Sequence, residues 1–196
     1  HEPEAAALAA GPGEGVGLIV DIGGGTSDFT LFRAEGAATR IIASHGVRIG
    51  GTDFDRALSL AHVMPLLGMG GELRNEIGPG RNAVPPALYH ELANWEKIAF
   101  VYGPDTLRDA KRMARLALDP NRMARLVNVL EMELGHDVAF AVEAAKIAAN
   151  GDKAQGVMGL DLVEKGLRPI IWQPELLAAL WPFASRIQAA ATATVS

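Results

Sequence analysis

The chain has 196 residues with a net charge of −5, and its 49% apolar and 21% charged residues are typical of a globular protein. The acidic balance argues against a nucleic-acid-binding surface, and no apolar run reaches the length of about 18 residues that a membrane span needs. We therefore expect neither nucleic acid nor a membrane as a partner. The chain has no cysteine, which excludes disulfides and thiolate metal sites and favours a reducing, cytoplasmic location.

The first quarter of the chain alternates glycine-rich segments with short apolar runs. The alanine-rich stretch 2–10 predicts a short helix, and the glycines and proline of 11–17 predict a loop. Three strands follow at 18–22, 28–32 and 39–44, because these runs are β-branched or alternate polar with apolar residues. Tight turns between them predict an antiparallel meander.

A helix is expected next. Thr52 is positioned as its N-cap, with Asp55 reaching back as in a capping box, and the helix should end before Pro65. Dense glycine and proline then predict an irregular segment over 64–86.

The section from about 89 to 150 has helical patterning. One helix is expected to be capped by Asp105 or Thr106. Another should start at Asp119-Pro120 and stop at Gly135, and a third should cover 138–149.

The last part of the chain predicts a hairpin with strands at 157–163 and 167–172. Pro174 opens a final helix that Pro182 should kink or cut, and the tail 189–196 is expected to fray. Strands, then helices, then a hairpin and a helix predict an α/β lobe that carries a smaller α+β lobe.

The segment DIGGGTSD, from Asp21 to Asp28, has the chemistry of a phosphate site. Gly23, Gly24 and Gly25 let backbone N–H groups approach an anion closely, and Thr26 adds a hydroxyl donor. A carboxylate beside phosphate needs a cation between them, so Asp21 implies Mg²⁺, held through water, with Asp28 as a second carboxylate. The plainer alternative is a hairpin with a glycine turn and solvated aspartates.

These residues resemble the second phosphate loop of the actin-like ATPase superfamily, Asp-x-Gly-Gly-Gly-Thr-x-Asp. The Glu-Pro-x-Ala-Ala-Ala segment from Glu2 resembles the corresponding element of DnaK-type heat-shock chaperones, whose glutamate helps to organise the metal and the γ-phosphate. Ile49-Gly50-Gly51-x-Asp53-Phe54-Asp55 resembles their turn beside the nucleotide. The resemblance makes Glu2, Asp21 and Asp28 the catalytic candidates.

A fourth element of the resemblance lies near residue 146. Glu143, Lys146 and Asn150 fall on one helix face and resemble the chaperones' adenosine-binding Glu-x-x-Lys-Arg-x-x-Ser. Ile147 replaces the arginine that stacks on adenine, and Asn150 replaces the serine. The alternative for this helix is a solvated Glu–Lys pair.

The resemblance implies a ribonuclease H-like core formed by 1–56 and 173–196, with a smaller α+β subdomain inserted at 57–172. It implies ATP or ADP with Mg²⁺ as ligands, and client or exchange-factor proteins as partners. Finer features, such as Trp95-Glu96-Lys97-Ile98 and Leu134-Gly135-His136, look most like the divergent YegD-like branch. The first phosphate loop and the catalytic lysine of the other lobe are not found in the sequence. The chain is therefore expected to be part of the second lobe, to bind nucleotide weakly, and not to hydrolyse it alone.

Three other functions remain open at this point. An MreB-like cytoskeletal filament ATPase shares the Gly-Gly-Gly-Thr and Ile-Gly-Gly elements. A sugar or acid kinase uses the same fold, and a scaffold could keep the fold without nucleotide affinity.

Overall fold

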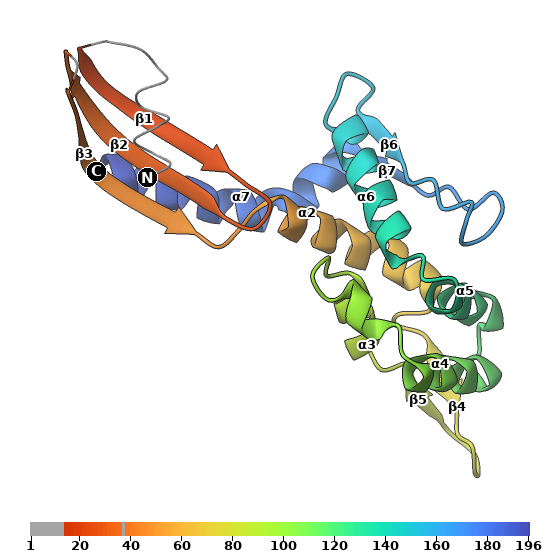
Figure 1. Cartoon of the computed structure of the whole chain (residues 1–196). Helices are drawn as coiled ribbons and strands as arrows, with labels where there is room; N and C mark the ends of the chain where they lie inside the picture. Colours follow the sequence, from red (N-terminus) through yellow and green to blue (C-terminus); the bar gives the residue numbers. More distant parts are fainter. Residues whose placement is uncertain (1–13, 37) are drawn as a thin grey trace. The chain divides into compact units, whose positions relative to one another are not determined.

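The computed structural model describes residues 14–36 and 38–196 and shows a mixed α/β protein with antiparallel sheets (Figure 1). The chain divides into two compact units, one formed by His1–Phe54 with Leu180–Ser196 and the other by Asp55–Ala179. The chain passes from one unit to the other within α2 (Gly51–Leu58) and returns within α7 (Gln173–Val195). The assignment of a core subdomain at 1–56 and 173–196 with an insertion at 57–172 stays a prediction.

The first unit contains a three-stranded meander, as predicted. Its strands are β1 (Gly15–Ile22), β2 (Ser27–Glu35) and β3 (Ala38–Val47), paired antiparallel in the order β1-β2-β3. β1 starts earlier than expected, because Gly17 belongs to the strand and not to a loop. Phe32 is its cross-strand partner, and the Phe32 ring occupies the space that a side chain at position 17 would need.

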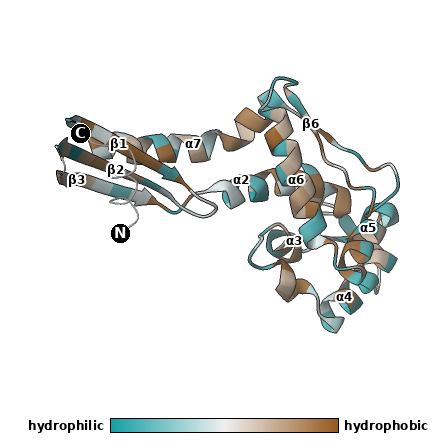
Figure 2. Ribbon diagram, turned by 45° about the horizontal axis from the view of Figure 1, so that its top comes forward, coloured by the Kyte–Doolittle hydropathy of each residue, from teal (hydrophilic) through white to brown (hydrophobic). Residues whose placement is uncertain are grey.

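The core of the first unit lies between this sheet and α7. Figures 1 and 2 both show the last part of α7 running beside the sheet. Phe29 is buried at 1% exposure, and Phe54 meets Phe183 of α7 edge to face at a ring distance of 5.8 Å. Pro182 does not cut the helix, and the tail predicted to fray is helical up to Val195.

The second unit is mainly helical and has its own core. The chain continues from α2 through a π-helical turn and a 3₁₀ turn, so the helical path does not end before Pro65 as predicted. The segment predicted as irregular contains a short hairpin. The elements that follow α2 are the π-helical turn Ser59–Val63, the 3₁₀ turn Met64–Leu67, β4 (Glu72–Arg74), β5 (Arg81–Ala83), α3 (Ala87–Leu92), the 3₁₀ turn Ile98–Val101, α4 (Pro104–Leu116), α5 (Pro120–Glu131), α6 (Gly135–Ala149), β6 (Gln155–Val157) and β7 (Ile170–Trp172).

The ends of the helices show which of the predicted capping residues act as caps in the structure. Asp119 caps α5 as predicted, since its Oδ1 accepts a hydrogen bond from the Arg122 N–H at 3.2 Å. α4 begins at Pro104 after Gly103, so neither Asp105 nor Thr106 is its N-cap. Gly135 does not stop α5 but begins α6. The Gly135 N–H donates a hydrogen bond to the Tyr102 hydroxyl at 2.7 Å.

The predicted hairpin near the C-terminus is confirmed in part. β6 pairs with β7 antiparallel, with Gly156 opposite Ile171, but each strand has only three residues. Beyond the strands, backbone bonds from the Met158 N–H to Pro169 O at 2.9 Å and from the Leu160 N–H to Leu167 O at 3.0 Å hold the loop together.

The helix predicted at 2–10, with Glu2, lies outside the described residues. Among the residues that the structure does describe, no helix is long and apolar enough to cross a membrane.

Candidate functional site

The glycine loop connects β1 to β2 and is closed by one internal hydrogen bond. Ile22 pairs with Ser27, and the Gly23 N–H donates to Thr26 O at 2.8 Å. Neither Gly23, Gly24 nor Gly25 has a positive φ. The turn itself therefore does not require glycine at these positions, so the reason for three glycines is not a left-handed backbone.

The outer side of this loop is open. A Cβ at Gly25 would meet no atom within 4 Å, and one at Gly24 would meet only the Thr52 methyl at 3.9 Å. Among residues 14–36 and 38–196, the N–H groups of Gly24, Gly25 and Thr26 donate to no acceptor. Successive backbone N–H groups that are exposed and unpaired can bind an anion.

The carbonyl side of the loop is fixed to the start of α2. Gly23 O accepts the Gly51 N–H at 3.0 Å, and Gly24 O accepts both the Thr52 N–H at 2.8 Å and the Thr52 hydroxyl at 2.7 Å. Gly50 packs so closely on this loop that a Cβ there would collide with the Gly24 backbone. The start of α2 thus holds the carbonyl oxygens of Gly23 and Gly24, and within the described residues it takes none of the N–H groups of Gly24, Gly25 and Thr26.

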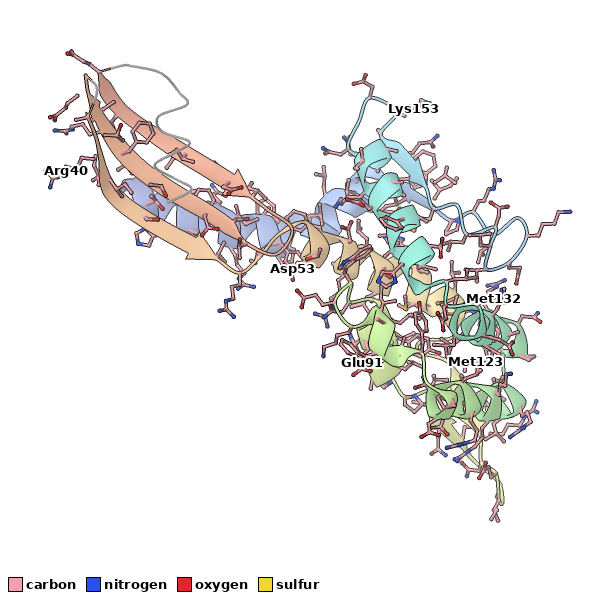
Figure 3. All side chains as sticks on the ribbon, in the orientation of Figure 1. Arg40, Asp53, Glu91, Met123, Met132 and Lys153 are labelled. Carbon is pink, nitrogen blue, oxygen red and sulfur yellow. The ribbon has the colours of Figure 1, made fainter. Side chains whose placement is uncertain are left out.

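The start of α2 is capped differently from the prediction. Asp53 Oδ2 accepts the Gly50 N–H at 2.9 Å, and Figure 3 shows Asp53 at the beginning of the helix. Thr52 is therefore not the cap, because its hydroxyl is used on the glycine loop, and Asp55 takes no part in a capping box. Ser27 adds a buried link, donating to Ile49 O at 2.8 Å.

Asp21 and Asp28 are cross-strand partners, so their side chains share one face of the sheet next to the loop. Both residues are exposed. The third strand leaves room for Asp28 because its partner there is Gly46, where a Cβ would collide with Asp28 Oδ1. Two opposed carboxylates suit a hard divalent cation.

The carboxylates near the loop fit Mg²⁺ held partly by water rather than a metal bound by protein alone. No group of three or more His, Asp or Glu side chains gathers around a possible metal position within the described part of the chain. Mg²⁺ usually keeps several waters and takes one or two carboxylates together with phosphate oxygens, which matches the two aspartates and the open loop.

The second group of predicted residues lies on α6, in the other unit. Glu143 is exposed, and Asn150 follows the last helical residue, with its N–H donating to Lys146 O at 3.1 Å. Lys146 does not pair with Glu143 as the simpler alternative supposed. Its Nζ lies 2.8 Å from Asp55 Oδ1, and the two side chains are only 17% and 20% exposed.

Asp55, the partner of Lys146, is the residue for which the sequence predicts a place in the capping box of α2. Burial raises the pKa of Asp55 above its ordinary value of 3.8, Lys146 opposes this, and the negative charge of Glu143 adds to it. Oδ1 is buried and accepts no well-aligned hydrogen bond among the described residues, so the contact is an ion pair of imperfect geometry. This pair joins α2 to α6.

The structure therefore brings the predicted site residues together in two groups. Asp21, Asp28, Gly50, Gly51 and the loop 23–26 lie in the first unit, and Glu143, Lys146 and Asn150 lie in the second. Ser27 was not predicted as part of the site, and the sequence predicted capping roles for Asp55 and Thr52 that the structure does not show. No local sequence signal pairs Asp55 with Lys146, because the two residues are far apart in the sequence and meet only through the packing of α2 on α6.

No protein-family model matches the chain. Part of it is 43% identical over 63 residues to the chaperone protein HscA homolog of Pseudomonas fluorescens, covering 30% of this chain and 10% of that protein. It is 40% identical over 73 residues to the heat shock 70 kDa protein BIP3 of Oryza sativa, covering 34% and 11%. With the HscA homolog of Azotobacter vinelandii it shares 32% identity over 108 residues, covering 53% and 17%.

The chain thus has distant, partial similarity to Hsp70-type chaperones. The matched part spans between 10% and 17% of the length of these relatives.

Proposed function

We propose that this chain is part of the ATP-binding domain of a DnaK-related chaperone ATPase, and that its glycine loop holds the nucleotide phosphates. The observation that carries the proposal is that the N–H groups of Gly24, Gly25 and Thr26 have no acceptor among the described residues, while the carbonyl oxygens of Gly23 and Gly24 are bound to the start of α2. The partial similarity to Hsp70-type chaperones supports the same assignment.

In this proposal the other site residues have separate roles. Asp21 and Asp28 hold Mg²⁺ through water, and the bound ion neutralises part of the phosphate charge. Glu143, Lys146 and Asn150 contact the adenosine, where Ile147, 65% exposed, offers an apolar surface in place of a stacking cation. Glu2, outside the described residues, is the remaining catalytic candidate.

The same proposal covers the architecture and the partners. The first unit belongs to a ribonuclease H-like core, the second is an inserted subdomain, and the YegD-like branch is the nearest type. A first lobe of the same protein supplies the opposite wall of the site, and client or exchange-factor proteins respond to the nucleotide state. Hydrolysis needs water, metal and γ-phosphate to be positioned together, so this chain alone binds nucleotide weakly and does not turn it over.

The loop amides themselves provide the test. In a ¹⁵N NMR titration with MgADP, we expect the signals of Gly24, Gly25 and Thr26 to shift, with a Kd on the order of 1 mM. Gly25→Ala should weaken this binding about tenfold, because its methyl group enters the space open to the phosphates while touching nothing in the protein.

The control for this titration is the fold of the variant. The amide spectrum of Gly25→Ala away from the loop should overlay that of the unmodified chain. If the loop signals do not shift at a nucleotide concentration of about 10 mM, the loop does not bind phosphate with a relevant affinity. If the chain releases phosphate from ATP and Asp21→Asn abolishes this release, the expected lack of hydrolysis is contradicted.

A further inference from the structure

A groove of about 500 Å³ lies in the second unit, between α3, α4 and the β4–β5 hairpin. Figures 1 and 2 show α3 beside α4, and Figure 3 labels Glu91 on α3. No residue of the proposed nucleotide site lines it. The lining residues are Leu73, Pro85, Ala87, Leu88, Glu91, Asp105, Thr106, Asp109, Arg112, Met113 and Leu116.

The floor of this groove is apolar. Leu73 is 8% exposed, and Leu88, Met113 and Leu116 are half-buried. Met113 and Leu116 are three residues apart on α4, so they present one face of the helix to the groove. Half-buried leucine and methionine side chains can gain stability by losing their remaining contact with water.

The rim carries an excess of negative charge. Asp105 pairs with Arg108 at 2.9 Å, and the groove's own cation, Arg112, is paired with Glu76 at 3.0 Å. Glu91 and Asp109 form no ion pair with any residue in the described ranges. Both residues line the groove, Glu91 from α3 and Asp109 from α4.

The remaining cations of α4 do not pair with Glu91 or Asp109. Arg108, Lys111 and Arg115 follow a different stripe of the helix, and none of them lines the groove. A phosphate-bearing ligand is therefore disfavoured here, whereas a cationic group near Glu91 and Asp109 is favoured.

We propose that this groove is a docking site for an amphipathic segment of a partner protein, one that carries apolar side chains next to lysine or arginine. The apolar side chains would lie on Met113 and Leu116, and the basic ones beside Glu91 and Asp109. Asp105 to Leu116 extends over about 16 Å of helix, enough for several residues of a bound segment and more than a small amine needs. The combination of an apolar floor with an oppositely charged rim is that of a peptide-binding groove.

The proposal is tested with a fluorescein-labelled helical peptide built from leucine and lysine, measured by fluorescence anisotropy against the full chain at low salt. We expect Glu91→Gln with Asp109→Asn to weaken binding about five- to tenfold. We expect Met113→Glu to weaken it by a similar factor, although it adds a negative charge, because it removes the apolar floor. Asp152→Asn, an exposed carboxylate on the loop after α6, is the matched control and should have no effect.

Three results would overturn the proposal. If the Met113→Glu variant binds the peptide as tightly as the unmodified chain or more tightly, the peptide is attracted by charge alone. A peptide of leucine and glutamate that binds as well as the lysine peptide would remove the charge complementarity. Binding that neither variant changes would place the peptide elsewhere. Circular dichroism of each variant checks that α4 is intact.

Discussion

Gly50 and Gly51 are neighbours in the sequence, but the structure gives them different constraints. Gly50 lies against the backbone of Gly23 and Gly24, where any Cβ collides with main-chain atoms. At Gly51 a Cβ would meet only Gly23 O, at an ordinary contact distance of 3.9 Å. Both residues have ordinary φ values, so the distinction is one of space and not of backbone conformation.

The first prediction follows from this difference. Gly50→Ala should destabilise the chain by about 1–3 kcal/mol, because backbone atoms must move to admit the methyl group. Gly51→Ala should change the stability by less than about 0.5 kcal/mol, since alanine is accepted in the first turn of a helix. Urea unfolding of the two variants measures both values. Equal destabilisation would show that the close approach at Gly50 does not matter.

Asp55 provides a prediction about pH. Burial raises its pKa above 3.8 in the folded chain, so the folded state binds more protons than the unfolded state just above that pH. The contribution of Asp55 to stability therefore improves as the pH falls through the raised pKa and worsens as the pH rises through it. Because Lys146 lowers this pKa and Glu143 raises it, Lys146→Met should shift it further up and Glu143→Gln should shift it down.

The side-chain carboxyl carbon of Asp55 in ¹³C NMR gives its pKa directly. The midpoint is expected above 3.8 in the unmodified chain. Opposite displacements in the two variants are the decisive result. A midpoint at the ordinary value, unchanged by either substitution, would mean that Asp55 is solvated and not paired with Lys146.

At the level of helices and strands, local signals predicted much of the fold. The alternating runs of β2 and the Asp119-Pro120 start of α5 were recognised because propensity and capping act within a few residues. The ends that were predicted wrongly depend on distant partners. Gly135 begins a helix because Tyr102 accepts its N–H, and Thr52 bonds Gly24 across 28 residues, which no local pattern records.

The same limit applies to the candidate site. The motif residues of the glycine loop could be identified from the sequence, because three glycines between strands are unusual. The ion pair between Asp55 and Lys146 could not, because it depends on how α2 meets α6.

The contact between β6 and α6 yields a prediction for these elements. Gly156 lies so close to α6 that a Cβ would overlap the backbone carbonyl of Ala145. Gly156→Ala should therefore destabilise the chain by about 2 kcal/mol or more, because a helix and a strand must separate. Gly159→Ala is the control, since a Cβ there meets no atom within 4 Å. Thermal unfolding measures both, and a similar melting temperature for the two variants would contradict the close packing.

For the molecule as a whole, the first unit exposes an unusual apolar surface. Val16, Leu18, Val20 and Ile22 alternate along β1, so they share one face, and each is between 40% and 57% exposed. On the same face of the neighbouring strand, the cross-strand partner of Val20 is Phe29, which is buried. Within the described residues no strand pairs with the outer edge of β1. An apolar strand with a free edge is a site for pairing with another chain.

We therefore expect the chain to self-associate as its concentration rises. Val20→Lys should reduce this, because a charge on the edge strand opposes pairing with a second copy and remains solvated in the monomer. Ile77→Lys is the matched control, since Ile77 is 92% exposed on the turn between β4 and β5 but is isolated from other exposed apolar side chains of that hairpin. Sedimentation velocity over a concentration series should show a smaller weight-average mass for Val20→Lys than for Ile77→Lys and the unmodified chain. If the two lysine variants reduce association equally, net charge rather than the β1 edge is responsible.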